Sequence, residues 1–271
     1  MIQTLKHIDR KFLELSWDTF FRSRGRHLPS SFYVPWLTND FTKKEIYSLV
    51  VADDLHVQAG LFILVKELNV NEEKIRVGLI GHVCVQESQR GKGIANNLLT
   101  EAVHCSQLNN MDFLTLWTGQ HKVYEKNGFF ISDRLQTLWI TASSVKNQNP
   151  ICFKIDRDFR YTSVPGYATD CQKLSFNGGT ISIITDPILD TVVDWSGEVD
   201  SVGDFMKQFF STNYKLCLST DDVLLQYLQK TSVVERSEKL NQQMWRVVNS
   251  KFTSAPMQLI DKINFGILDR I

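Results

Sequence analysis

The sequence has none of the long apolar runs, cysteine pairs or low-complexity tracts that identify membrane, disulfide-rich or repetitive chains. No apolar stretch reaches the roughly 18 residues that a membrane-spanning helix needs. Residues 1–7 lack the apolar core of a signal peptide. The five cysteines are dispersed and include no Cys-x-x-Cys pair, so neither a disulfide framework nor a metal site is expected. We therefore expect a cytoplasmic protein without a bound metal ion.

The sequence also has no excess of either charge. Its 30 Lys and Arg residues balance 30 Asp and Glu residues, and its isoelectric point is about 7.0. Proteins that bind nucleic acid or membrane surfaces need a basic face, so neither partner is expected. The length of 271 residues suits one large domain or two domains of ordinary size.

One stretch changes its apolar pattern from that of a strand to that of a helix. Residues 79–85 are mostly apolar, with Leu79, Ile80, Val83 and Val85. Apolar residues then recur at helical spacing at Ile94, Leu98, Leu99, Ala102 and Val103. A basic turn with two glycines, Arg-Gly-Lys-Gly-Ile-Ala at residues 90–95, lies between the two patterns. Such a turn can direct several amide N–H groups and the positive end of the helix dipole at an anion. It therefore predicts a phosphate-binding site.

The turn departs from two other phosphate-binding motifs. A Walker loop needs Ser or Thr after its lysine to hold magnesium, but Lys92 is followed by Gly93. A dinucleotide fingerprint needs a third small residue, where this chain has Asn96. The pattern Arg-x-x-Gly-x-Ala after a strand instead resembles the acyl-CoA pyrophosphate loop of the GNAT superfamily of N-acetyltransferases.

A second motif follows about thirty residues later. A short apolar strand is expected at residues 114–117, and residues 123–130 read Val-Tyr-Glu-Lys-Asn-Gly-Phe-Phe. Gly128 lies where a short helix needs a C′ residue with positive φ. The run Tyr-Glu-Lys-x-Gly-Phe resembles the GNAT helix that carries the general-acid tyrosine. The two motifs occur in the order that this fold requires, which implies a mixed α/β sheet of the GNAT type.

The two halves of the chain differ in their motifs. Residues 1–145 are expected to form a catalytic GNAT domain that closes with a strand at 138–140, and the polar stretch 143–150 is the expected linker. Residues 151–271 repeat the strand-helix-strand-helix-strand order, so they resemble a second, degenerate GNAT unit, with an unrelated α+β domain as the alternative. Residues 196–200, at the position of the phosphate turn, contain two acids and no basic residue. No CoA site is expected there.

The resemblance implies a set of acyl-CoA-binding residues in the first half. The pyrophosphate would be held by the backbone amides and basic side chains of the turn, which are Arg90, Gly91, Lys92, Gly93, Ile94 and Ala95. The strand before the turn would pair with the pantetheine amides and offer a main-chain N–H to the thioester oxygen, at Val83 and Val85. The alternatives are a tight turn with solvated basic side chains and two valines of an ordinary core.

The resemblance also implies acid and base groups. Tyr124 is the expected general acid for the leaving thiolate, although it is also compatible with a packing role. Many relatives place a glutamate near the position of Gly81, where glycine cannot act as a base. The adjacent His82 is the expected base, because its ordinary pKa lies near 6.5. His121, Glu87 and water remain open as bases. The turn before His121 lacks the asparagine of many relatives, which leaves open how pantetheine is held.

The sequence thus predicts an acetyl-CoA-dependent N-acetyltransferase that transfers the acetyl group directly to a primary amine. The acceptor, a small molecule or a protein, is not identified, and a homodimer stays open. A longer acyl-CoA or a hydroxyl acceptor would give a different enzyme. The alternative from another class is a non-catalytic acyl-CoA-binding or interaction protein on a GNAT scaffold.

Overall fold

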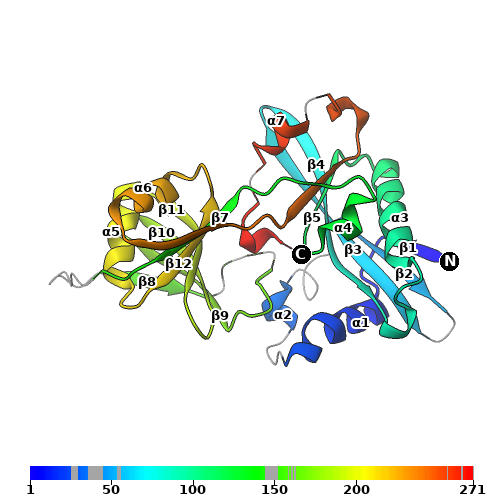
Figure 1. The fold of residues 1–271 in the computed structure, drawn as a ribbon, viewed down its shortest axis with the longest axis horizontal. Helices are drawn as coiled ribbons and strands as arrows, with labels where there is room; N and C mark the ends of the chain where they lie inside the picture. Colours follow the sequence, from blue (N-terminus) through cyan, green and yellow to red (C-terminus); the bar gives the residue numbers. More distant parts are fainter. Residues whose placement is uncertain are drawn as a thin grey trace. The chain divides into compact units, whose positions relative to one another are not determined.

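The computed structural model describes residues 1–25, 30–35, 45–53, 56–143, 152–157, 159, 161, 163–254, 256–263 and 265–270. Within these residues the chain forms two seven-stranded sheets (Figure 1). It divides into two compact units. The first contains Met1–Asp133, Gln242–Ile263 and Arg270–Ile271, and the second contains Arg134–Asn241 and Asn264–Asp269. No helix within the described ranges is long and apolar enough to span a membrane.

The sheet of the first unit is antiparallel except at one pair of strands. Its order is β1 (Ile2–Leu5), β2 (Ile46–Ala52), β3 (Val57–Val70), β4 (Glu73–Val85), β5 (Phe113–Trp117), β14 (Gln243–Val247) and β6 (Phe130–Ile131). The parallel pair is β4 and β5. A parallel connection needs a crossover, which here contains helix α3 (Ile94–Leu108).

Helices cover both faces of this sheet. Leu61 and Ile63 of β3 belong to the core that α3 covers, whereas Phe62 between them contacts Phe12 of α1 (Arg10–Phe20) with ring centroids 4.7 Å apart. Successive side chains of a strand point to opposite faces, so α1 lies on the face opposite α3. The remaining helices of the unit are η1 (Arg22–Arg24), α2 (Ser30–Tyr33), η4 (Glu87–Gln89), α4 (His121–Glu125), η5 (Ser250–Phe252) and α7 (Pro256–Ile260).

The second unit repeats this plan. Its sheet has the order β13 (Val234–Lys239), β7 (Leu135–Ile140), β12 (Tyr214–Ser219), β11 (Thr191–Gly197), β10 (Gly179–Thr185), β9 (Asp170–Phe176) and β8 (Phe153–Asp156). Its parallel pair is β11 and β12, with α5 (Val199–Phe209) between them in sequence. A core cluster joins α5 and α6 (Val223–Thr231) to the sheet. A short helix, η6 (Ile267–Asp269), completes the unit. Strands β9 and β10 form an antiparallel hairpin that turns at Asn177 and Gly178.

Two strands belong to a different sheet from the one that their sequence positions indicated. The strand expected at 138–140 to close the first domain is part of β7, which pairs with β12 and β13 of the second sheet. Strand β14 lies in the range 151–271 that was assigned to the second domain, but it pairs with β5 and β6 of the first sheet. The compact units therefore differ from the continuous ranges 1–145 and 151–271. Strand partners so distant in sequence leave no local signal, because periodicity reports the strand and not its neighbour.

Candidate functional site

The parallel strands β4 and β5 pair over only a short length. Their pairs are Val77↔Phe113, Gly78↔Leu114 and Leu79↔Thr115. Beyond Leu79, β4 continues to Val85 without pairing to β5 in the described residues, while β5 stays paired with β14 up to Trp117. The two strands thus separate toward the end at which the predicted phosphate turn follows β4.

A β-bulge lies in the separated part of β4. Gly60 pairs with Cys84 and Phe62 with Gly81, so two β4 residues, 82 and 83, face the single β3 residue between them. His82 has a left-handed backbone with φ 57°. The bulge directs His82 toward α1, whereas Val83 and Val85 pack against the core below α3. The two valine side chains therefore have the contacts of ordinary core residues, which was the alternative to a CoA-related role. These contacts hold the backbone of this part of β4 in place.

His82 as a whole is half-buried, and its ring lies among three phenylalanines. The ring centroids of Phe20, Phe21 and Phe62 are 5.7, 6.0 and 5.8 Å from that of the imidazole. Nδ1 shares a hydrogen bond with the hydroxyl of Ser16 on α1. Burial lowers the pKa of His82 to about 4. The imidazole is therefore neutral at pH 7 and a weaker base than its ordinary pKa indicates.

The predicted phosphate turn connects β4 to α3. Gly91 and Gly93 have φ of 78° and 76°, the left-handed region that favours glycine. A Cβ atom at either position would meet no other atom within 4 Å. These glycines are therefore needed for the backbone conformation, and the space above them is open.

A row of amide donors lies at the start of α3. Arg90 donates its N–H to the carbonyl of Glu87 at 3.2 Å, and Asn97 donates to that of Gly93 at 3.1 Å. Between these bonds, the N–H groups of residues 91–96 donate to no group in the part of the chain that the structure describes. Unpaired N–H groups at a helix N-terminus, together with the helix dipole, attract anions. The local backbone thus has the row of free N–H groups that the predicted anion site needs.

Both basic side chains of the turn lie against the turn itself. Arg90 Nε donates to the carbonyl of Val85 at 3.2 Å. Lys92 Nζ donates to Oε1 of Gln89 at 2.7 Å. Their charges therefore add to the positive potential of the same short segment.

Tyr124 lies on the short helix α4 that follows β5. Gln120 N–H donates to the hydroxyl of Thr118 at 2.9 Å, which sets the turn before the helix. Tyr124 is half-buried against the core below α3, and burial raises its pKa above the ordinary value, with the Thr118 hydroxyl acting in the opposite direction. Helix α4 ends at Glu125 with Lys126 as its C-cap, so Gly128 lies one residue beyond the predicted C′ position, and it has the predicted positive φ, 73°.

A polar clamp that the sequence reasoning missed joins α4 to α3. The side chain of Asn127 donates to Oδ1 of Asn96 at 3.0 Å and accepts from the hydroxyl of Thr100 at 3.2 Å. Asn127 is buried, with 8% of its surface exposed. This clamp fixes Tyr124 relative to the first turn of α3. Only the residue type of Asn127, common near helix ends, hinted at it.

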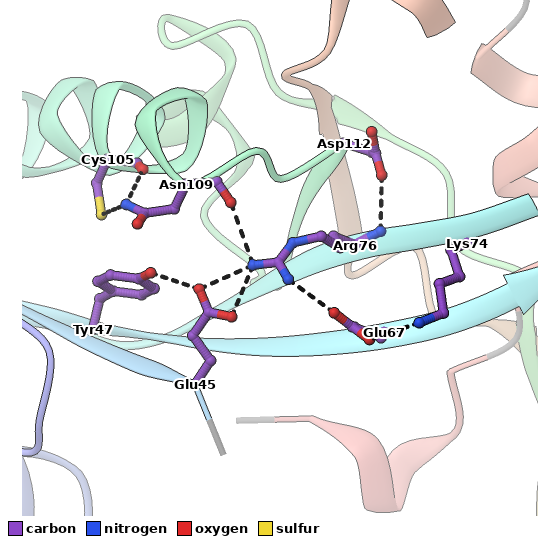
Figure 2. Close-up of polar contacts among 8 residues, drawn as sticks. All are labelled: Glu45, Tyr47, Glu67, Lys74, Arg76, Cys105, Asn109 and Asp112. Carbon is purple, nitrogen blue, oxygen red and sulfur yellow. Dashed lines mark hydrogen bonds and ion pairs between the residues drawn. The ribbon is translucent and has the colours of Figure 1, made fainter. Parts of the chain in front are cut away.

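A larger polar cluster holds β4 and β5 at the end where they do pair. Figure 2 shows Arg76 at its centre. The Arg76 guanidinium contacts Glu45 and Glu67, each at 2.8 Å, and the carbonyl of Asn109 at 3.3 Å. Its backbone N–H donates to Oδ2 of Asp112 at 2.9 Å, directly before β5. The strands therefore diverge from a fixed point.

The site thus contains a bulged strand that leaves its neighbour, an amide-lined turn and a clamped helix. The family model described as an acetyltransferase (GNAT) domain matches residues 45–130, which contain all three features. The N-terminal half of this chain contains a GNAT domain. No curated protein matches the sequence.

Solved structures extend the GNAT likeness over both units. The chain is similar to a GCN5-related N-acetyltransferase from Kribbella flavida, with a TM-score of 0.64 and 11% identity over 92% of this chain and 72% of that chain. The chain is also similar to Eis1 from Mycobacterium abscessus, with a TM-score of 0.60 and 13% identity over 92% of this chain and 74% of that chain. A third similar structure is a tandem GNAT protein from the clavulanic acid biosynthesis pathway. Its TM-score is 0.51, and its identity is 8% over 92% of this chain and 99% of that chain. At these identities the likeness shows the fold, a mixed α/β architecture with two seven-stranded sheets.

The predicted site residues occupy two faces of the GNAT sheet. The turn and Tyr124 lie on the face that α3 covers, and His82 lies on the face of α1. Among the described residues, no group of three or more His, Cys, Asp or Glu side chains is placed to hold a metal ion.

Proposed function

We propose that this protein is an acetyl-CoA-dependent N-acetyltransferase that transfers the acetyl group directly to a primary amine. The main support is the row of N–H donors at residues 91–96, located at the start of α3 and next to the diverging strands. These donors would bind the pyrophosphate of the acyl-CoA. The backbone of β4 at Val83 and Val85, which lies beyond the last pair of β4 with β5, would face the pantetheine arm.

Under this proposal the amine attacks the thioester carbon, the carbon–sulfur bond breaks, and CoA leaves as a thiolate. Tyr124 would protonate the thiolate sulfur. A phenol is protonated near neutral pH, and burial raises the pKa of Tyr124 further, so the hydroxyl is available as a donor. The clamp at Asn127 would hold this hydroxyl at a constant distance from the phosphate site.

His82 remains the proposed proton acceptor, with a restriction from its surroundings. Because its pKa is lowered to about 4, it takes a proton from a free alkylammonium only at a large free-energy cost. We propose that it accepts the proton after the amine nitrogen has begun to bond to the thioester carbon, when that nitrogen is far more acidic. The same low basicity favours the second candidate function, a non-catalytic acyl-CoA-binding protein.

Calorimetric titration of acetyl-CoA and CoA tests the proposal. Wild type should bind both, and Gly93→Asp should lose binding because it adds a charge and a strained side chain among the amides. Gly25→Asp is the matched control, since Gly25 also has a positive φ (69°) and no atom within 4 Å of an added Cβ. Absence of binding by wild type would overturn the proposal.

A screen of primary amines for release of the CoA thiol then separates the two candidate functions. Turnover with any amine supports the acetyltransferase. Binding of acetyl-CoA without turnover across amino acids, polyamines, amino sugars and peptides would favour the binding protein.

A further inference from the structure

One face of α4 carries two half-buried side chains. Lys122, Val123 and Glu125 are exposed, whereas His121 and Tyr124 are half-buried. Residues three apart on a helix lie on the same side, so His121 and Tyr124 form the inner face of α4 together. The proposed general acid therefore has an imidazole as its neighbour on that face.

The Nε2 atom of His121 is buried and has no hydrogen-bond partner in the part of the chain that the structure describes. Buried polar atoms are nearly always hydrogen-bonded, so this atom calls for a partner. Two other histidines of the same unit have one, because His82 bonds to Ser16 and His104 approaches Glu101 at 3.4 Å. His121 thus differs from these two histidines, and its Nε2 indicates a group from outside the chain.

The place of His121 in the fold indicates which group that is. The turn from Thr118 to Gln120 follows β5 beyond its last pair with β4, at the end where these strands separate. Thr118 N–H donates to the carbonyl of Gln242 at 2.8 Å, which fixes this turn beside β14. An arm that runs from the phosphate turn along the separated part of β4 would pass this end of β5.

We infer that His121 binds the pantetheine arm of the acyl-CoA through Nε2, an assignment that rests on the proposed function. Pantetheine carries amide N–H and C=O groups, and the nitrogen of a neutral imidazole can pair with either. The inference also accounts for the lack of an asparagine in the turn before α4.

Binding of two ligands tests this assignment without any turnover. CoA carries the pantetheine arm, whereas 3′-phospho-ADP retains the nucleotide and the pyrophosphate and lacks the arm. His121→Ala should weaken CoA binding about tenfold, the effect of one hydrogen bond at a buried site, and leave 3′-phospho-ADP binding unchanged. His121→Asn should recover part of the loss, because an amide also donates and accepts.

His104→Ala is the matched control, since His104 is exposed on α3, and it should alter neither affinity. Equal weakening of both ligands by His121→Ala, or of neither, would overturn the inference while the proposed function stands. If wild type binds neither ligand, the proposed function and the inference fail together.

A second measurement uses only the wild type, so it tests the inference even if His121→Ala does not fold. The ¹⁵N resonance of His121 Nε2 in wild type should shift on addition of CoA and stay unchanged with 3′-phospho-ADP. The same shift with both ligands would contradict contact with the arm.

Discussion

The two units connect their parallel strands in different ways. In the first unit eight residues, 86–93, separate β4 from α3, and two of them are glycines with positive φ. In the second unit β11 ends at Gly197 and α5 begins at Val199, so Glu198 alone lies between them. The same strand-helix-strand order therefore occurs with and without a turn that can surround an anion.

The helix N-terminus of the second unit is also occupied by the chain itself. Glu198 N–H donates to the carbonyl of Gly178 at 3.0 Å, and a Cβ at Gly197 would collide with that same carbonyl. Glu198 and Asp200 add negative charge at this helix start. The prediction that the second half has no CoA site rests on these two acids and on the lack of a basic residue at 196–200. The comparison teaches that the connection, and not the sheet order, makes a phosphate site.

The sharpest test of the comparison uses the tyrosines of the corresponding helices. Tyr124→Phe on α4 should lower kcat about 100-fold or more with CoA affinity unchanged, because a proton donor is lost. Tyr227 on α6 instead packs on Gly203 and accepts from Lys207 at 3.3 Å. Tyr227→Phe should leave kcat unchanged. Equal kcat values for the two variants in steady-state assays would remove the assigned difference between α4 and α6.

The two glycines before α3 and α5 should respond in opposite ways. Gly93→Ala strains a left-handed position with open space around it, so CoA affinity should fall about tenfold, while the melting temperature falls by only a few degrees. Gly197→Ala should lower the melting temperature, because its Cβ meets backbone atoms, and leave CoA affinity unchanged. Calorimetry and thermal unfolding of both variants check this, and a loss of stability in Gly93→Ala as large as that in Gly197→Ala would count against a ligand-directed role.

The helix pairs are also joined by different contacts. Tyr227 packs directly on Gly203 between α6 and α5, whereas Asn127 clamps α4 to α3 through polar bonds. Asn127→Leu keeps the volume and removes the bonds, so kcat should fall about fivefold while KM for acetyl-CoA changes little. A parallel rise in KM, seen in steady-state kinetics, would show that the clamp serves binding and not the placement of Tyr124.

The smallest expected effect concerns the bulges. The β4 bulge carries His82, and the corresponding bulge of β11 carries the buried Val193. The pKa of His82 is about 4 in the folded protein and has the ordinary value of 6.5 in the unfolded chain. Between these pH values the unfolded chain therefore binds more protons than the folded protein does. The stabilisation that the neutral imidazole provides is complete above pH 6.5 and is lost as the pH falls toward 4.

His82→Leu should therefore flatten the fall in melting temperature over that range, relative to wild type. Val193→Ala should lower the melting temperature by the same amount at every pH, because no titrating group is removed. An unchanged slope for His82→Leu in thermal unfolding would show that burial does not set the pKa of this histidine.

Local patterns predicted the parts of the site that local physics forms. The positive φ of Gly91, Gly93 and Gly128 follows from glycine placed between a strand and a helix or after one. The low basicity of His82 could not be predicted, because Phe62 and the residues of α1 that surround it are distant in sequence. The same holds for Asn127, whose partners Asn96 and Thr100 reach it only through the packing of two helices.

The exchange of β7 and β14 between the sheets sets an order on synthesis. β5 lacks its neighbour on one side until residues 243–247 have left the ribosome, by which point almost the whole second unit has been made. The unit that begins first is therefore completed last. Until then β5 presents an unpaired edge, the kind of surface that recruits other chains, so protection of this edge in the nascent protein is part of what the fold demands of the cell.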